Sequence, residues 1–166
     1  MILPEQAVIL LVEDRDDDVF LVKRALAQAN VRNPFFIVRD GEEAVEYLEG
    51  LGKYRQREEY PLPDIILLDL KMPKMDGFEV LRYVRSKPEF KALRIIALTS
   101  SEDLQDVNQA YELGANSFLV KPLEFENYAA MLRTLASFWL HHSRAPVVER
   151  IAERKKNRLP PEGANN

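Results

Sequence analysis

Five polar residues follow short apolar segments of the sequence and could together bind a phosphoryl group and a divalent cation. Glu13 and Asp14 follow AVILLV, Asp69 follows IILL, Thr99 follows RIIAL, and Lys121 follows SFLV. Carboxylates a few ångströms apart repel one another and cannot all stay ionised without a countercharge. Mg²⁺ prefers oxygen ligands and often bridges carboxylates and a phosphoryl group, and a lysine ammonium and a threonine hydroxyl would complete such a pocket.

Whether these residues meet depends on the elements that carry them. The apolar runs are continuous rather than alternating, which predicts strands buried on both faces, near residues 7–12, 35–38, 65–69, 94–98 and 117–120. Helical spacing of apolar residues lies between and after them, over 16–30, 42–48, 76–86, 103–113 and 124–140. A strict alternation of strand and helix predicts an α/β fold, a doubly wound parallel sheet of five strands with five helices on its two faces.

In such a sheet, ligands bind beyond the carboxyl ends of the strands, where the strand order reverses. A 2-1-3-4-5 order would make the first and third strands neighbours, so Asp14 and Asp69 would converge with Glu13 close by. We therefore expect one domain over 1–140 and a basic extension, 141–166, that is disordered at its end. The long polar segment 49–63 is either an interaction feature or plain surface.

Each candidate residue also has an ordinary structural explanation. Asp16 and its acidic neighbours could cap and open a helix, and Asp69 could belong to a turn before Pro73. Thr99 with the residues after it resembles a capping box, and Lys121 could be a solvated loop lysine. These explanations do not account for the coincidence of all the groups at one edge of one sheet.

Composition excludes several other kinds of chemistry. The 166-residue chain has no cysteine and only two histidines, His141 and His142, so disulfides, thiolate sites and histidine-based zinc sites are not expected. No apolar run approaches the length of a membrane span and the N-terminus lacks a signal peptide, which predicts a cytoplasmic protein. Residues 141–166 carry a net charge of about +3 and the rest about −7, so we expect no nucleic-acid partner.

Four segments together resemble the response-regulator receiver domain of bacterial two-component signalling, a flavodoxin-like fold. They are LLVEDRDDD, DIILLDLKMPKMDGFEVLR, IIALTSS and GANSFLVKP. The resemblance covers residues 7 to about 140 and is specific, because the acidic pair, the phosphoacceptor aspartate, the threonine and the Lys-Pro pair follow the expected strands in order.

The resemblance implies that Asp69 is phosphorylated by a sensor histidine kinase. It implies Mg²⁺, for which Mn²⁺ or Ca²⁺ could substitute, bound by Asp14, Asp69 and the backbone carbonyl of Lys71. Glu13 would act through a metal-bound water.

The resemblance also assigns roles to residues of the last two strands. Thr99 would turn its hydroxyl toward the phosphoryl group, and Lys121 would pair with it and be followed by a cis bond to Pro122. Phe118 stands where many members of the family have a tyrosine that switches between rotamers when the domain is phosphorylated. The switching residue therefore has no hydroxyl here. Lys71 occupies a position whose side chain tunes the lifetime of the acyl phosphate.

The C-terminal part of the receiver resembles small single-domain regulators paired with bacterial phytochrome kinases. In that subgroup, homodimers form through the last strand and helix, which makes Phe138, Trp139 and Leu140 candidates for a dimer interface. Ordinary core packing of the last helix is the alternative. Too few residues follow Leu140 for a DNA-binding output domain, so signalling through protein contacts is expected.

Two other functions use related parts. An aspartate-nucleophile phosphatase of the haloacid dehalogenase type also combines a strand-end aspartate with Mg²⁺, threonine and lysine, but has a second aspartate where this chain has Lys71. A nucleotide-binding module would need a glycine-rich loop after the first strand, whereas VEDRDDD is acidic and has no glycine.

Overall fold

A five-stranded parallel sheet forms the centre of the molecule. The computed structural model describes residues 4–142. Its strand order is β2-β1-β3-β4-β5, as predicted. The strands are β1 (Ile9–Val12), β2 (Phe35–Val38), β3 (Ile65–Leu68), β4 (Arg94–Thr99) and β5 (Ser117–Val120).

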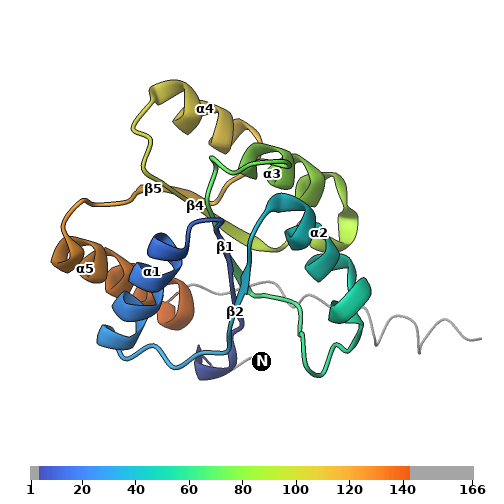
Figure 1. Ribbon diagram of the computed structural model, residues 1–166, viewed down its shortest axis with the longest axis horizontal. Coiled ribbons are helices and arrows are strands. Elements are labelled where there is room, and N and C mark those ends of the chain that lie inside the picture. The colour runs from blue at the N-terminus through green and yellow to red at the C-terminus, as the bar shows by residue number, and fades with distance from the viewer. Residues whose placement is uncertain (1–3, 143–166) are drawn as a thin grey trace, which may run out of the picture.

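Five α-helices cover the two faces of this sheet (Figure 1). They are α1 (Asp16–Gln28), α2 (Gly41–Glu49), α3 (Gly77–Ser86), α4 (Leu104–Glu112) and α5 (Phe125–Ala136). Helices α1 and α5 lie side by side on one face, and α2, α3 and α4 line the other. Within the described part of the chain, no helix is long and apolar enough to cross a membrane.

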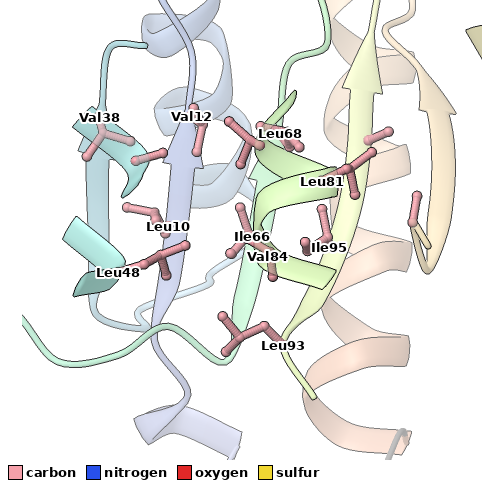
Figure 2. Packing of buried hydrophobic residues seen from close by; sticks show 14 of the residues in the cluster. Leu10, Val12, Val38, Leu48, Ile66, Leu68, Leu81, Val84, Leu93 and Ile95 are labelled. Carbon is pink, nitrogen blue, oxygen red and sulfur yellow. The ribbon is translucent and has the colours of Figure 1, made fainter. Parts of the chain in front are cut away.

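The central strands are buried on both faces because successive side chains enter opposite hydrophobic cores. Leu10 and Val12 of β1 belong to the core beneath α2 and α3, whereas Ile9 and Leu11 belong to the core beneath α1 and α5. Figure 2 shows the first of these cores, where α2 and α3 pack on the sheet; its labelled residues include Leu10, Leu48, Ile66, Leu81, Val84 and Ile95.

The predicted segments differ from the observed ones mainly at their ends. Strand β1 begins two residues later than expected, β3 ends at Leu68, and β4 extends to Thr99. The last α-helix ends at Ala136 and continues as a π-helical segment, η4 (Ser137–His142). Such changes of winding leave the apolar spacing nearly unaltered, so a sequence pattern does not reveal them. The predicted extension lies outside the described residues beyond His142.

The long segment after α2 is anchored to the domain. Tyr54 and Tyr60 pack with Tyr47 of α2 in an aromatic cluster, with ring centroids 4.9 to 6.3 Å apart. Arg57 donates hydrogen bonds to the carbonyls of Tyr47 and Leu48, which lie at the C-terminal end of α2. The expectation that this segment is plain surface is therefore wrong for its aromatic side chains, which pack against the domain.

Gly77 lets helix α3 begin directly against the end of β3. Its amide donates to the carbonyl of Leu70 at 3.1 Å. A Cβ at this position would lie 2.4 Å from the carbonyl oxygen of Asp69 and 2.7 Å from the Cα of Leu70, both of which are backbone atoms. The absence of a side chain at Gly77 thus determines how closely α3 approaches the backbone of Asp69.

Replacing Gly77 by alanine tests this close approach. We expect Gly77→Ala to lower the free energy of unfolding by about 2 kcal/mol, because the new methyl group must push backbone atoms apart in a packed region. Denaturant unfolding measures the change. The control is Arg82→Ala on the exposed side of α3, expected to change stability by less than about 0.5 kcal/mol. Equal stability of Gly77→Ala and the wild type would contradict the close contact.

Candidate functional site

The carboxyl ends of four strands meet at one edge of the sheet and carry the predicted site residues. The amide of Asp69, just after β3, donates to the carbonyl of Val12 at 3.0 Å, and the amide of Lys121, just after β5, donates to the carbonyl of Thr99 at 2.8 Å. Backbone pairing therefore continues one residue beyond the strands. It fixes the positions from which the site side chains project.

Three carboxylates converge at this edge. Glu13, Asp14 and Asp69 each offer one oxygen, and these oxygens lie within 4.8 Å of one another. Glu13 is 1% exposed and Asp69 6%, while Asp14 is half-buried. Asp14 Oδ1 is buried and has no hydrogen-bond partner. An unpartnered oxygen beside two further carboxylates fits a hard divalent cation, which takes oxygen ligands of this kind.

Lys121 supplies positive charge to the cluster. Its ammonium group lies 2.6 Å from Glu13 Oε2 and 3.1 Å from Asp18 Oδ2, and its side chain is 9% exposed. A solvated loop lysine is therefore excluded. Asp18, in the first turn of α1, was not among the predicted site residues, since the acidic run at 14–18 gives no sign of which member faces β5.

Burial and repulsion change the acidity of these groups. Burial raises the pKa of Glu13 to about 7, and the charge of Asp69 adds to the effect while the hydrogen bond from Lys121 opposes it. Burial also raises the pKa of Asp69. Burial alone would lower the pKa of Lys121, but its hydrogen bond to Glu13 and the charge of Asp69 leave it above the ordinary value. The pocket therefore favours the binding of additional positive charge.

Thr99 and Lys71 are the other predicted site residues at the ends of β4 and β3. Thr99 is fully buried, and its Oγ1 accepts a hydrogen bond from the amide of Ser101 at 3.2 Å. The amide of Lys71 donates to Asp69 Oδ1 at 3.3 Å. The side chain of Lys71 turns away to Asp106 of α4, at 3.0 Å. Asp106 was not predicted from the sequence.

The capping explanations for the site residues are wrong in detail. Helix α1 has Arg15 at its N-cap without a side-chain bond, and Asp16 is instead exposed and paired with Arg39 at 2.8 Å. Helix α4 is capped by Asp103, whose carboxylate accepts from the amide of Gln105. Thr99 lies too far upstream to cap that helix, because four residues intervene before its first turn.

The predicted cis bond before Pro122 is not observed. The described residues contain no cis peptide bond, so Lys121 and Pro122 are joined in trans. The trans form is the more stable one even before proline, by about 0.5 to 1 kcal/mol. The backbone of Lys121 is held by its pairing to Thr99 in this trans geometry.

Phe118 is half-buried against the core beneath α2 and α3. Its amide donates to the hydroxyl of Tyr111 on α4 at 3.1 Å. Phe118 itself has no hydroxyl, but the hydroxyl of Tyr111 lies beside it. That hydroxyl accepts its hydrogen bond from the backbone of β5, the edge strand. Sequence reasoning did not single out Tyr111, which lies within the helix predicted over 103–113 and is 51% exposed.

The three dimer candidates have different environments. Leu140 is buried in the core beneath α1 and α5, as the core-packing alternative expected. Trp139 is half-buried, and its ring lies 5.4 Å from the guanidinium of Arg94. Phe138 is 53% exposed and packs edge-on against Trp139. Of the three, Phe138 offers the most surface to a partner.

Comparison with known proteins agrees with this arrangement. Residues 9–133 match the family described as the response regulator receiver domain. The chain belongs to this family. The fold, the strand-end acids and the buried lysine are therefore those of a receiver domain, and the phosphatase of the haloacid dehalogenase type is not favoured.

Three relatives illustrate the similarity of this receiver domain to known proteins. Response regulator Rcp1 of Synechocystis sp. is 39% identical over 80% of this chain and 88% of its own length. The Mn²⁺-bound form of Rcp1 superposes with a TM-score of 0.76 at 38% identity, covering 85% of this chain and 99% of that one. The phosphorylated cyanobacterial phytochrome response regulator RcpA has a TM-score of 0.79 at 35% identity, with the same coverage.

The third relative, after Rcp1 and RcpA, is the receiver domain of the sensor histidine kinase PA1611 from Pseudomonas aeruginosa. It has a magnesium ion coordinated in its active site cleft. It superposes with a TM-score of 0.63 at 29% identity, covering 81% of this chain and 98% of that one. Receiver domains thus bind Mg²⁺ or Mn²⁺ at an acidic site, and this receiver domain has such an acidic cluster.

The raised pKa of Glu13 predicts an unusual pH dependence of stability. Between pH 4.5 and about 7 the folded protein holds a proton that the unfolded chain has released, so raising the pH lowers the free energy of unfolding. Without divalent ions we expect Glu13 to contribute a decrease of about 2 kcal/mol over this range. Denaturant unfolding of Glu13→Gln should lack that contribution, while the exposed control Glu46→Gln keeps it. Identical pH profiles for the wild type and Glu13→Gln would contradict the assignment.

Proposed function

We propose that the protein is a phosphoacceptor signalling protein in which Asp69 receives a phosphoryl group from a sensor histidine kinase. The observation that carries this proposal is the buried cluster of Glu13, Asp14 and Asp69 with its unpartnered Asp14 oxygen, beside the ammonium of Lys121. In the transfer, an oxygen of Asp69 forms a bond to phosphorus. The bond from phosphorus to the donor imidazole breaks, and its electron pair stays with that nitrogen.

Mg²⁺ is the cofactor that the site fits best, and Mn²⁺ or Ca²⁺ could substitute. Asp14, Asp69 and the backbone carbonyl of Lys71 would hold the ion, with Glu13 acting through a bound water. The ion would supply charge neutralisation for the phosphoryl oxygens, which is what phosphoryl transfer needs most. This assignment agrees with the net negative charge of the cluster.

Residues on β4 and β5 would complete the phosphoryl pocket. Lys121 is already held at the cluster by Glu13 and Asp18, so its ammonium is positioned to pair with a phosphoryl oxygen without a large rearrangement. The Thr99 hydroxyl is buried at the end of β4 and can donate to another phosphoryl oxygen by a small shift. The change of charge at Asp69 would then bias the surface formed by α4 and β5, including Phe118.

The kinase partner is proposed to be of the phytochrome type. This rests on the similarity to Rcp1 and RcpA, and on the match to bacteriophytochrome response regulator RtBRR at 40% identity over 91% of this chain. Output through protein contacts in the cytoplasm, without nucleic acid, is part of the same proposal. A phosphatase role is disfavoured because Lys71 stands where a second aspartate would be needed, and its side chain is paired with Asp106.

Phosphorylation by a small acyl-phosphate donor tests the assignment of Asp69. In the presence of Mg²⁺ we expect intact-mass measurement to detect one added phosphoryl group, and Asp69→Asn to abolish it because the nucleophilic carboxylate is gone. The control is Asp17→Asn, an exposed aspartate in the first turn of α1, which should be labelled like the wild type. Labelling of Asp69→Asn at the wild-type level would overturn the proposal.

We also propose a homodimer formed through β5, α5 and the segment after it. Phe138 supports this, since a phenylalanine beside a half-buried tryptophan leaves apolar surface at the end of the molecule. Arg133, Thr134, Ser137 and His142 line a shallow hollow with Phe138, with a volume of about 450 Å³. Such a surface could receive side chains of a second copy.

Light scattering at tens of micromolar tests the dimer. We expect the wild type to be dimeric and Phe138→Ser to shift the protein toward monomer, because burial of the ring would be lost. Phe20→Ser is the matched control, since Phe20 is 62% exposed and belongs to α1, which is not one of the elements proposed for the interface. A wild-type protein that is monomeric both with and without a phosphoryl mimic would contradict the dimer.

A further inference from the structure

A chain of polar contacts outside the carboxylate cluster connects the two sides of the site. The amide of Lys71 donates to Asp69, and the ammonium of the same residue pairs with Asp106 on α4. The Ser101 hydroxyl donates to Asp106 Oδ2 at 2.8 Å, and the Ser101 amide donates to the Thr99 hydroxyl. Asp69 and Thr99 are thereby joined through Lys71, Asp106 and Ser101, which we call the Asp106 relay.

Asp106 is the centre of this relay. It is 9% exposed although it lies in the first turn of a surface helix. Both of its oxygens are 3.0 Å from the Lys71 ammonium, whose stem also places that charge 5.4 Å from the centre of the Phe78 ring. The contacts with Ser101 and Lys71 lower the pKa of Asp106, so it is charged at neutral pH. One buried carboxylate therefore holds both the loop after β3 and the loop after β4.

The loop between β4 and α4 depends on the same carboxylate. Ser101 donates to Asp106 through its hydroxyl, and that hydroxyl accepts from the amide of Asp103 at 3.2 Å. Because the Ser101 amide points at Thr99, the orientation of Ser101 determines where the threonine hydroxyl rests. A movement of Thr99 toward Asp69 would draw Ser101 away from Asp106.

We propose that Asp106 is a positioning residue that holds Thr99 and Lys71 in the arrangement of the unphosphorylated protein and so opposes phosphoryl binding at Asp69. The inference rests on the proposed role of Asp69. Phosphoryl binding would act against the relay, because the phosphoryl oxygens attract the hydroxyl of Thr99, to which the amide of Ser101 donates.

Thermodynamic linkage gives the direction of the effect. If phosphoryl binding weakens the relay, then loss of the relay must strengthen phosphoryl binding by the same factor. The Lys71 side chain is 58% exposed, so its ion pair with Asp106 contributes only a modest free energy to the relay. We expect about a fivefold change in affinity, which corresponds to ~1 kcal/mol.

The chain provides a matched control on the other side of the same loop. Lys74 pairs with Asp40 at 2.9 Å, and its side chain is 60% exposed, nearly the same as that of Lys71. This pair ties the loop to the start of α2 and has no contact with Ser101 or Thr99. Its removal should affect the loop's anchoring but not the position of the threonine hydroxyl.

The test measures binding of beryllium fluoride, a tetrahedral mimic of a phosphoryl group, in the presence of Mg²⁺ by calorimetry. We expect Asp106→Asn and Lys71→Met each to bind about fivefold more tightly than the wild type, and the double variant to bind no more tightly than either one. Lys74→Met should stay within about twofold of the wild type. The Ser101 amide resonance of unliganded Asp106→Asn should move toward its position in the liganded wild type.

The outcomes separate this inference from the function on which it rests. Unchanged or weaker binding in Lys71→Met, which alters an exposed side chain and will fold, would overturn the relay. The relay would also be overturned if the affinity gains of the two substitutions multiplied in the double variant, or if Lys74→Met gained as much affinity as Lys71→Met. If the wild type does not bind beryllium fluoride, or if Asp69→Asn binds it as tightly as the wild type, the proposed function is wrong and the relay with it.

Discussion

The structure depends on holding several negative charges at the carboxyl edge of a buried sheet. Glu13 and Asp69 are almost fully buried, and Asp14 adds a third carboxylate within 4.8 Å. In water these groups would separate, but here the backbone pairing of β1 and β3 forces them together. Lys121, which is 108 positions from Glu13 in the sequence, offsets part of this charge. Burial, to which the charge of Asp69 adds, raises the pKa of Glu13, and the negative charge that Lys121 leaves uncompensated fits the site for a cation.

The surrounding elements keep this arrangement fixed. Gly77 brings α3 against the backbone of Asp69. The loop after β3 is tied to α2 by Lys74, which adopts a left-handed φ of 61°, and to α4 by Lys71. A lysine rarely takes this conformation, and the ion pair with Asp40 helps to keep it there. The same loop thus connects Asp69 to the two helices on either side of α3.

Much of the fold and of the site follows from local sequence patterns. Continuous apolar strands alternating with amphipathic helices determine the doubly wound sheet, and the strand order then brings together Glu13, Asp14, Asp69, Thr99 and Lys121. Two of the residues that the sequence did not reveal, Asp18 and Asp106, make contacts with Lys121 and Lys71 that span 103 and 35 positions. Contacts between residues so far apart in the sequence cannot be predicted from a local sequence pattern. The cis bond expected before Pro122 came from the family resemblance, and the structure has a trans bond there, which residue spacing does not determine.

The most direct test of the central claim is to locate the phosphoryl group chemically. The protein would be phosphorylated with Mg²⁺ and an acyl-phosphate donor and treated with borohydride, which reduces an acyl phosphate to an alcohol, and the reduced residue would be found by peptide mass spectrometry. We predict reduction at Asp69 alone. Reduction at Glu13, Asp14 or any other carboxylate, with Asp69 unmodified, would contradict the account.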